Sequence, residues 1–150
     1  MGRDLGFEKY EKDCKQIREE NEKLLEGFVK HLEKSGLKEK TIDQHYQNVD
    51  VFLNTFLLYY EANTAADGID MIGDYLGDFF IRKCMWSTPA RTKQTIASFK
   101  KFYAYMETIG KVTPEKLEGM HETIKMFSGD WIESVRAYND PDEDWDWELF

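Results

Sequence analysis

Two short segments of this chain, fifty residues apart, place basic and hydrogen-bonding side chains at expected helix starts. The first is the run Gly36–Ile42 and the second is Ser87–Lys93. Each is a turn of small or polar residues, followed by Lys or Arg together with Thr and Gln. The N–H groups of a helix start carry a partial positive charge that attracts phosphate. The two segments therefore predict two phosphate-docking points in one small domain.

Amphipathic helices must position these segments. Apolar residues follow both starts in one shared register, Tyr46, Val49, Phe52, Leu53 and Phe56 after the first, and Ile96, Phe99, Phe102, Tyr103 and Met106 after the second. Spacing of three or four residues is typical of one buried helix face. We expect helices over about 7–34, 40–60 and 70–83, a fourth from Thr88-Pro89 to about 110, and a fifth from Thr113-Pro114 to about 138. Ser128-Gly129-Asp130 could break the last one, with Asp130 capping a further short helix.

The pattern predicts an all-α, single-domain bundle of five or six helices. We divide it into an N-terminal helical extension (1–23), a core (24–110), a C-terminal helix packed on that core (111–138) and an acidic, Trp-rich tail (139–150). Ser35-Gly36 should end the first helix, because glycine adopts the left-handed conformation that often follows a helix. Gly73 and Gly77 either weaken the third helix or allow close contact with another helix.

Composition favours a soluble, folded protein. The 150 residues are 41% hydrophobic, and no segment approaches the roughly 20 apolar residues that cross a bilayer. The N-terminus lacks the apolar stretch of a signal peptide. Cys14 and Cys84 have no nearby partner in the sequence, which is typical of reduced thiols. We expect a cytoplasmic protein without a membrane partner.

The net charge of −9 is unevenly distributed. Residues 82–111 hold seven Lys or Arg against Glu107 alone, whereas residues 112–150 hold three bases and eleven acids. Binding depends on the local patch more than on net charge. The segment 82–111 is either a surface that faces an anionic partner or the solvated face of an amphipathic helix.

The order of these motifs resembles the core-binding, SAM-like N-terminal domain of tyrosine recombinases and phage integrases. The matching stretches are Leu25–Leu58 and Trp86–Met106, and the resemblance covers roughly residues 24–110. Gly36-Leu37, Lys40-Thr41-Ile42, Thr88-Pro89 and Phe102-Tyr103 occupy the places of the family's short motifs. In that family the domain clamps one face of the DNA duplex, with its second and fourth helices toward the major groove.

The resemblance implies that ten side chains face duplex DNA: Lys38, Lys40, Thr41, Gln44, His45, Thr88, Arg91, Lys93, Gln94 and Lys100. Lys, Arg and Thr suit phosphate contacts, and Gln or Arg suits base edges. We expect the second cluster to dominate, because Glu39 and Asp43 dilute the first. For His45 the alternative is a partly exposed helix residue without a ligand.

The recombinase catalytic domain has no counterpart in this sequence. Its signature includes His-x-x-Arg, and none of the three histidines here begins that motif. We therefore expect no enzyme activity, no catalytic residue, no metal site and no cofactor. The predicted function is a non-catalytic DNA-binding module, accessory to DNA integration or recombination, with a recombinase or another protein as a further partner.

The alternative is a protein-interaction module on the same fold that has lost DNA binding and engages a basic partner or itself. The tail, with Trp145, Trp147 and Phe150 among its acids, is either a frayed end or an autoinhibitory segment that covers Arg91, Lys93 and Lys100. Cys84, beside Met85 and Trp86, is expected to serve packing, and Glu19, Glu20 and Glu22 to form a solvated face.

Overall fold

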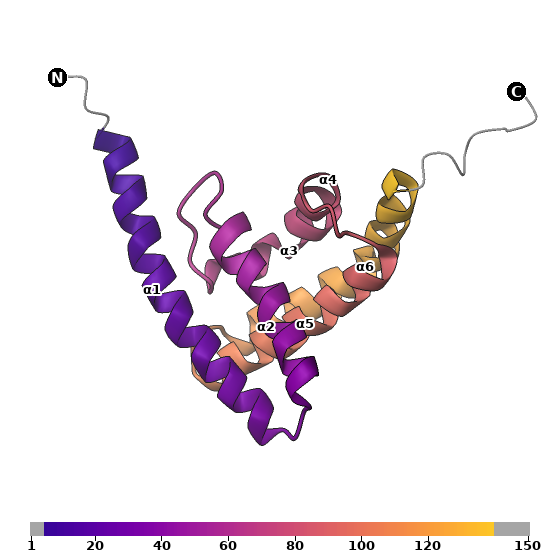
Figure 1. Ribbon diagram of the computed structural model, residues 1–150, viewed down its shortest axis with the longest axis horizontal. Helices are drawn as coiled ribbons and strands as arrows, with labels where there is room; N and C mark the ends of the chain where they lie inside the picture. Colours follow the sequence, from indigo (N-terminus) through magenta and orange to yellow (C-terminus); the bar gives the residue numbers. More distant parts are fainter. Residues whose placement is uncertain (1–4, 140–150) are drawn as a thin grey trace, which may run out of the picture.

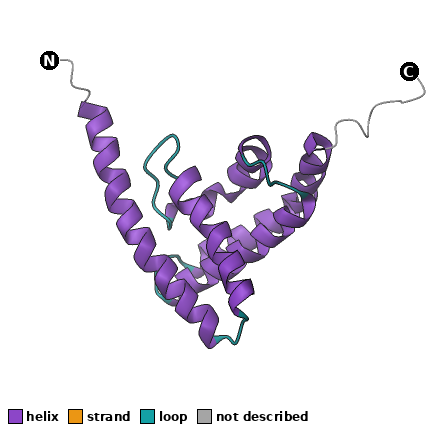
Figure 2. Cartoon of the chain, in the orientation of Figure 1, coloured by secondary structure: helices purple, strands orange, loops and turns teal. Residues whose placement is uncertain are grey.

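The computed structural model describes residues 5–139, which form an all-α domain (Figures 1 and 2). Its long helices are α1 (Leu5–Lys34), α2 (Glu39–Val51), α5 (Pro89–Thr108) and α6 (Pro114–Asn139). Between α2 and α5, residues 52–56 and 67–83 form short helical turns, and residues 57–66 form a loop. No strand occurs within residues 5–139. The predicted all-α fold class is thus confirmed.

Two glycine turns create two helix pairs, α1–α2 and α5–α6. Gly36 and Gly110 have φ values of 82° and 74°, a region that is costly for other residues. The same two backbone hydrogen bonds close both turns. In the first, the Gly36 and Leu37 N–H groups donate to the carbonyl oxygens of Glu33 and Leu32. In the second, the Gly110 and Lys111 N–H groups donate to the carbonyl oxygens of Glu107 and Met106. This bonding pattern is the Schellman motif, which satisfies the last carbonyls of a helix. The predicted end at Ser35-Gly36 is confirmed.

Threonine caps begin α5 and α6, as the sequence predicts. The Thr88 hydroxyl accepts the Arg91 N–H at 3.0 Å, and the Thr113 hydroxyl accepts the Lys116 N–H at 3.1 Å. Proline follows each cap at the first helical position, where it loses no hydrogen bond. The break considered at 128–130 is wrong, because α6 runs without interruption from Pro114 to Asn139.

In the middle of the chain the structure differs from the expected second and third helices. The second ends as a π-helical turn, η1 (Phe52–Phe56), and not as an α-helix to residue 60. The third is divided into a 3-10 turn η2 (Asp67–Met71), α3 (Ile72–Asp74), a second π-helical turn η3 (Tyr75–Phe79) and α4 (Phe80–Lys83). Aromatic packing accompanies the two π-helical turns, since the Phe56 ring lies 5.1 Å from Tyr75 and 5.0 Å from Phe79.

The core lies where α2 crosses α5 and α6 covers the other side of α5. Figure 1 shows α1 and α6 as outer arms with α2 between them. The shared apolar register is confirmed at nine of its ten positions, which are buried, whereas Tyr46 is 37% exposed. A Cβ on Gly77 would lie 3.1 Å from the Trp131 ring, so this glycine permits the close contact with α6 that the sequence suggested as one alternative.

Candidate nucleic-acid interface

The two expected docking segments meet where α2 crosses α5, which we call the α2–α5 crossing. The Gln44 amide donates to Gln94 Oε1 at 2.7 Å, and the Asn48 amide donates to Ser98 Oγ at 3.0 Å. Both pairs are separated by fifty residues. The two apolar patterns in the sequence are also fifty residues apart, so residues at equivalent positions of the two patterns contact each other across the helices.

A buried polar network holds the crossing together. Ser98 is fully buried, and its Oγ lies 2.7 Å from His45 Nδ1 and 3.0 Å from the Gln94 carbonyl oxygen of its own helix. A hydroxyl has one proton and two lone pairs. If Ser98 donates to the Gln94 carbonyl, it accepts from Asn48 and from a protonated Nδ1 of His45. These bonds use its whole capacity.

His45 lies inside this network, with most of its side chain buried. It is 8% exposed, so the partly exposed alternative is wrong for its side chain, and the expected DNA contact stays a prediction. Burial lowers its pKa below the usual value, and the nearby charge of Lys101 lowers the pKa further. His45 therefore positions α2 against α5 as a neutral group.

One edge of the crossing gathers five of the ten predicted contact residues around a hollow. A surface hollow of about 230 Å³ is lined by Lys40, Thr41, Gln44, His45, Gln94 and Ala97. The side chains of Lys40, Thr41 and Gln94 are exposed beside it. Lys93 and Lys100 are seven residues apart on α5, about two helical turns, so they share one face. Lys38 precedes α2 and makes no side-chain cap, which leaves the first-turn N–H groups of α2 without a capping side chain.

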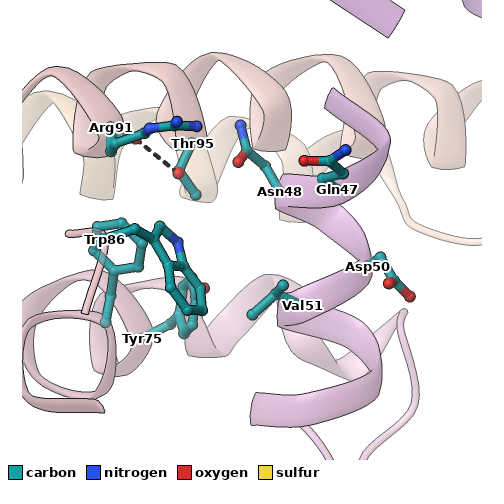
Figure 3. A pocket seen from close by; sticks show the side chains of 9 residues that line it. Gln47, Asn48, Asp50, Val51, Tyr75, Trp86, Arg91 and Thr95 are labelled. Atoms are coloured by element: carbon teal, nitrogen blue, oxygen red, sulfur yellow. Dashed lines mark hydrogen bonds between the residues drawn. The ribbon is translucent and has the colours of Figure 1, made fainter. Parts of the chain in front are cut away.

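Arg91 lies on the opposite edge. It is two residues from Lys93, so its side chain points about 200° around the helix. Arg91 lines a different hollow, of about 310 Å³, with Thr95 from α5 and Gln47 and Asn48 from α2 (Figure 3). The predicted basic stretch is therefore divided by the α2–α5 crossing.

Sequence reasoning missed two residues near the crossing, one on α5 and one beside the separate 310 Å³ hollow. Lys101 is exposed on α5 and acts electrostatically on His45, which places it near the crossing. Trp86 lines the 310 Å³ hollow and is 47% exposed, whereas from the sequence it was named only as a neighbour of Cys84. Its position just before the Ser87-Thr88 cap was a usable signal, because a residue there lies next to the start of α5. Thr88 is exposed, but its hydroxyl is already used by the cap.

An acidic groove runs between α1 and α2. Two adjoining hollows of about 460 and 470 Å³ share Val29 and Glu33. Their remaining lining is mostly acidic or apolar: Glu22, Glu26, Lys30, Leu37, Glu39, Ile42, Asp43 and Tyr46. Glu39 and Asp43, which were expected to dilute the first basic segment, thus line a different edge of α2 from Lys40. The domain presents two surfaces of opposite charge.

The structure also bears on the predictions for the cysteines, for a metal site and for a membrane span. Cys14 and Cys84 are free and buried, and burial raises the pKa of the Cys84 thiol. Within residues 5–139 no three His, Cys, Asp or Glu side chains are arranged to hold a metal ion. In the same range no helix combines the length and hydropathy needed to cross a membrane. The autoinhibitory tail falls outside the described residues and stays a prediction.

Comparison of the chain with protein-family models, with characterised proteins and with solved structures gave no match.

Proposed function

We propose that this protein is a non-catalytic module that binds duplex DNA through the α2–α5 crossing. The observation that carries the proposal is the meeting of Lys40, Thr41 and Gln44 with Gln94 around one hollow. Lysines on the exposed face of α5 continue this surface. The resemblance to recombinase core-binding domains assigns the same side chains to DNA contact.

The chemistry of the surface suits a phosphate backbone. Lys93, Lys100 and Lys101 are exposed, and none makes an ion pair within the part of the chain that the structure describes. Lysines of this kind bind phosphates as point charges and release counterions. Gln44 and Gln94 carry amides, which suit base edges in the major groove. We infer an accessory role in DNA integration or recombination, without strand cleavage.

Charge reversal with a matched control tests the proposal. The variant K93E/K100E/K101E changes the surface of α5, and K12E/K15E/K125E makes the same change in net charge at exposed lysines of α1 and α6. Fluorescence anisotropy with a labelled duplex across a salt series measures affinity. Each lost phosphate contact should reduce the slope of log affinity against log salt by about 0.9, so the first variant should lose about 2.7.

The control should bind nearly as the wild type does. Equal loss of affinity in both variants would show that only net charge matters, and no binding by the wild type at low salt would refute the proposal. Residues 140–150 should be deleted in parallel. A gain in affinity on deletion would support autoinhibition, and unchanged affinity would exclude it.

The acidic groove favours a second candidate, a protein-interaction module for a basic partner. Its apolar floor includes Val29 and Leu37, and carboxylates from both helices line it. A cationic amphipathic helix has the complementary pattern. Calorimetric titration with such a peptide tests this candidate, and E26K/E33K should abolish the heat signal while K93E/K100E/K101E leaves it unchanged.

A further inference from the structure

The 310 Å³ hollow beside the α2–α5 crossing has features that duplex binding does not use. Buried Tyr75 and Phe80 contribute aromatic surface to it, and Val51 of α2 lines it as well. Figure 3 shows Trp86 and Val51 facing each other across the opening, with Thr95 and Asn48 on a third side. Trp86 is 47% exposed beside this hollow, so part of its ring is accessible to a ligand.

Hydrogen-bonding groups with unused donors or acceptors line the same hollow. Within residues 5–139, the Arg91 guanidinium and the Gln47 amide make no hydrogen bond or ion pair. Asn48 uses its amide N–H on Ser98, which leaves its Oδ1 available. Asp50 accepts a bond from Asn54 at 2.6 Å on one oxygen and has the other free. Donors and acceptors therefore lie around an aromatic surface.

This arrangement matches the parts of a nucleotide. A planar base stacks on an exposed indole, amide groups pair with its edge, and arginine binds phosphate. The volume lies near the lower limit of the roughly 300–1,000 Å³ of small-molecule sites, so it suits one base and not a longer ligand. A base inside a duplex has both faces covered, so it must leave the stack to reach Trp86.

We propose that this hollow holds one unpaired nucleotide of DNA, with its base against Trp86 and its phosphate at Arg91. The inference rests on the proposed DNA binding, since Arg91 lies on the same helix as the lysines that would hold the adjoining duplex. The protein would then prefer a junction between duplex and single strand over a continuous duplex. A free nucleotide has the same chemistry, and the test must separate the two sources.

The test compares labelled blunt duplexes with duplexes that carry three unpaired nucleotides at the 5′ or the 3′ end, measured by anisotropy. Stacking of one base on an aromatic side chain should favour one of the overhangs by about five- to a hundredfold. Trp86→Ala should remove this preference and leave blunt-duplex affinity unchanged. Phe127→Ala, which removes an aromatic side chain of α6 that is 43% exposed, should change neither.

Gln47→Ala guards against a misfolded tryptophan variant, because Gln47 is exposed and has no partner within the described range. This variant should reduce the overhang preference by a smaller factor. The indole N–H resonance of Trp86, identified by its absence in Trp86→Phe, should shift when a three-nucleotide strand is added. The same titration with a deoxynucleoside monophosphate tests the free ligand.

The outcomes distinguish failure of the nucleotide site from failure of the proposed duplex binding. Equal affinity for blunt and overhanging duplexes, with no change at the Trp86 resonance, would overturn the inference and leave duplex binding intact. A shift with the monophosphate at low concentration, without any binding of DNA, would assign the hollow to a free nucleotide and refute both DNA proposals. Overhang preference that persists in Trp86→Ala would place the unpaired strand elsewhere and overturn the inference.

Discussion

Ser98→Ala should destabilise the domain because it removes the centre of the buried network at the crossing. The substitution leaves His45 Nδ1 and the Asn48 amide without their shared acceptor. A buried donor without a partner costs about 1–3 kcal/mol. His45 should incur most of that cost, and half-buried Asn48 less, because water can reach it. We therefore expect a loss of about 2–4 kcal/mol from the free energy of unfolding.

Urea denaturation followed by circular dichroism measures this loss. The midpoint should fall while the dependence on urea concentration stays constant, which indicates a change in stability alone. Thr92→Val is the matched control. Thr92 is fully buried on the same helix, but its hydroxyl bonds only the Thr88 carbonyl of that helix, at 3.0 Å. We expect that variant to lose less than about 1 kcal/mol, because no side chain of α2 loses a partner.

A loss below about 0.5 kcal/mol in Ser98→Ala would refute the reasoning, since the network would not hold the two helices together. Equal destabilisation of Thr92→Val would refute the reasoning as well, because the loss would then not depend on the contacts with α2. In the folded fraction of Ser98→Ala we also expect weaker duplex binding, because Lys40 and Gln94 would be held less firmly in one surface.

Two further predictions concern packing and pH. Gly68→Ala should cost about 1–3 kcal/mol of stability, because the new Cβ would lie 2.6 Å from Leu57 Cδ1 in the core. Gly119→Ala should stabilise α6 by about 0.5–1 kcal/mol, because nothing lies within 4 Å of its new Cβ. Thermal unfolding of both variants measures the two changes, and changes of equal sign would contradict the packing. The lowered pKa of His45 means that the unfolded chain binds a proton more readily than the folded one, so stability should fall as pH falls below about 6.5. His45→Gln should remove that part of the pH dependence in urea midpoints between pH 7 and 5.5, and an identical dependence in both proteins would show that His45 is not its source.

Local chemistry explains which helix boundaries were predictable. Gly36 ends α1, and Thr88 followed by proline begins α5, because each signal acts through hydrogen bonds within a few residues. The π-helical turns at Phe52–Phe56 and Tyr75–Phe79 were missed. Their sequences have ordinary helical spacing, and the aromatic contacts that accompany them join rings from distant segments.

The residue types of the candidate site were predictable from the sequence, but their arrangement was predictable only in part. Basic and amide side chains at two helix starts were visible in the sequence, and the structure does bring Lys40 and Gln94 to one hollow. The burial of His45 was not predictable, because an isolated histidine on a helix is compatible with either face. The 310 Å³ hollow was also invisible, since Trp86 and Gln47 are almost forty residues apart.

The sequence by itself determined the caps, the apolar register and the charge of each helix face, because neighbours within one or two turns decide these. Only the tertiary structure decided which faces are covered. Since α2 crosses α5 at Gln94 and Ser98, Arg91 lies at a different edge of the crossing from Lys93, and one basic segment of the sequence became two separate edges. A helix fixes the angles between its own side chains, but the packing of other helices determines which of them meet solvent, a buried partner or a hollow.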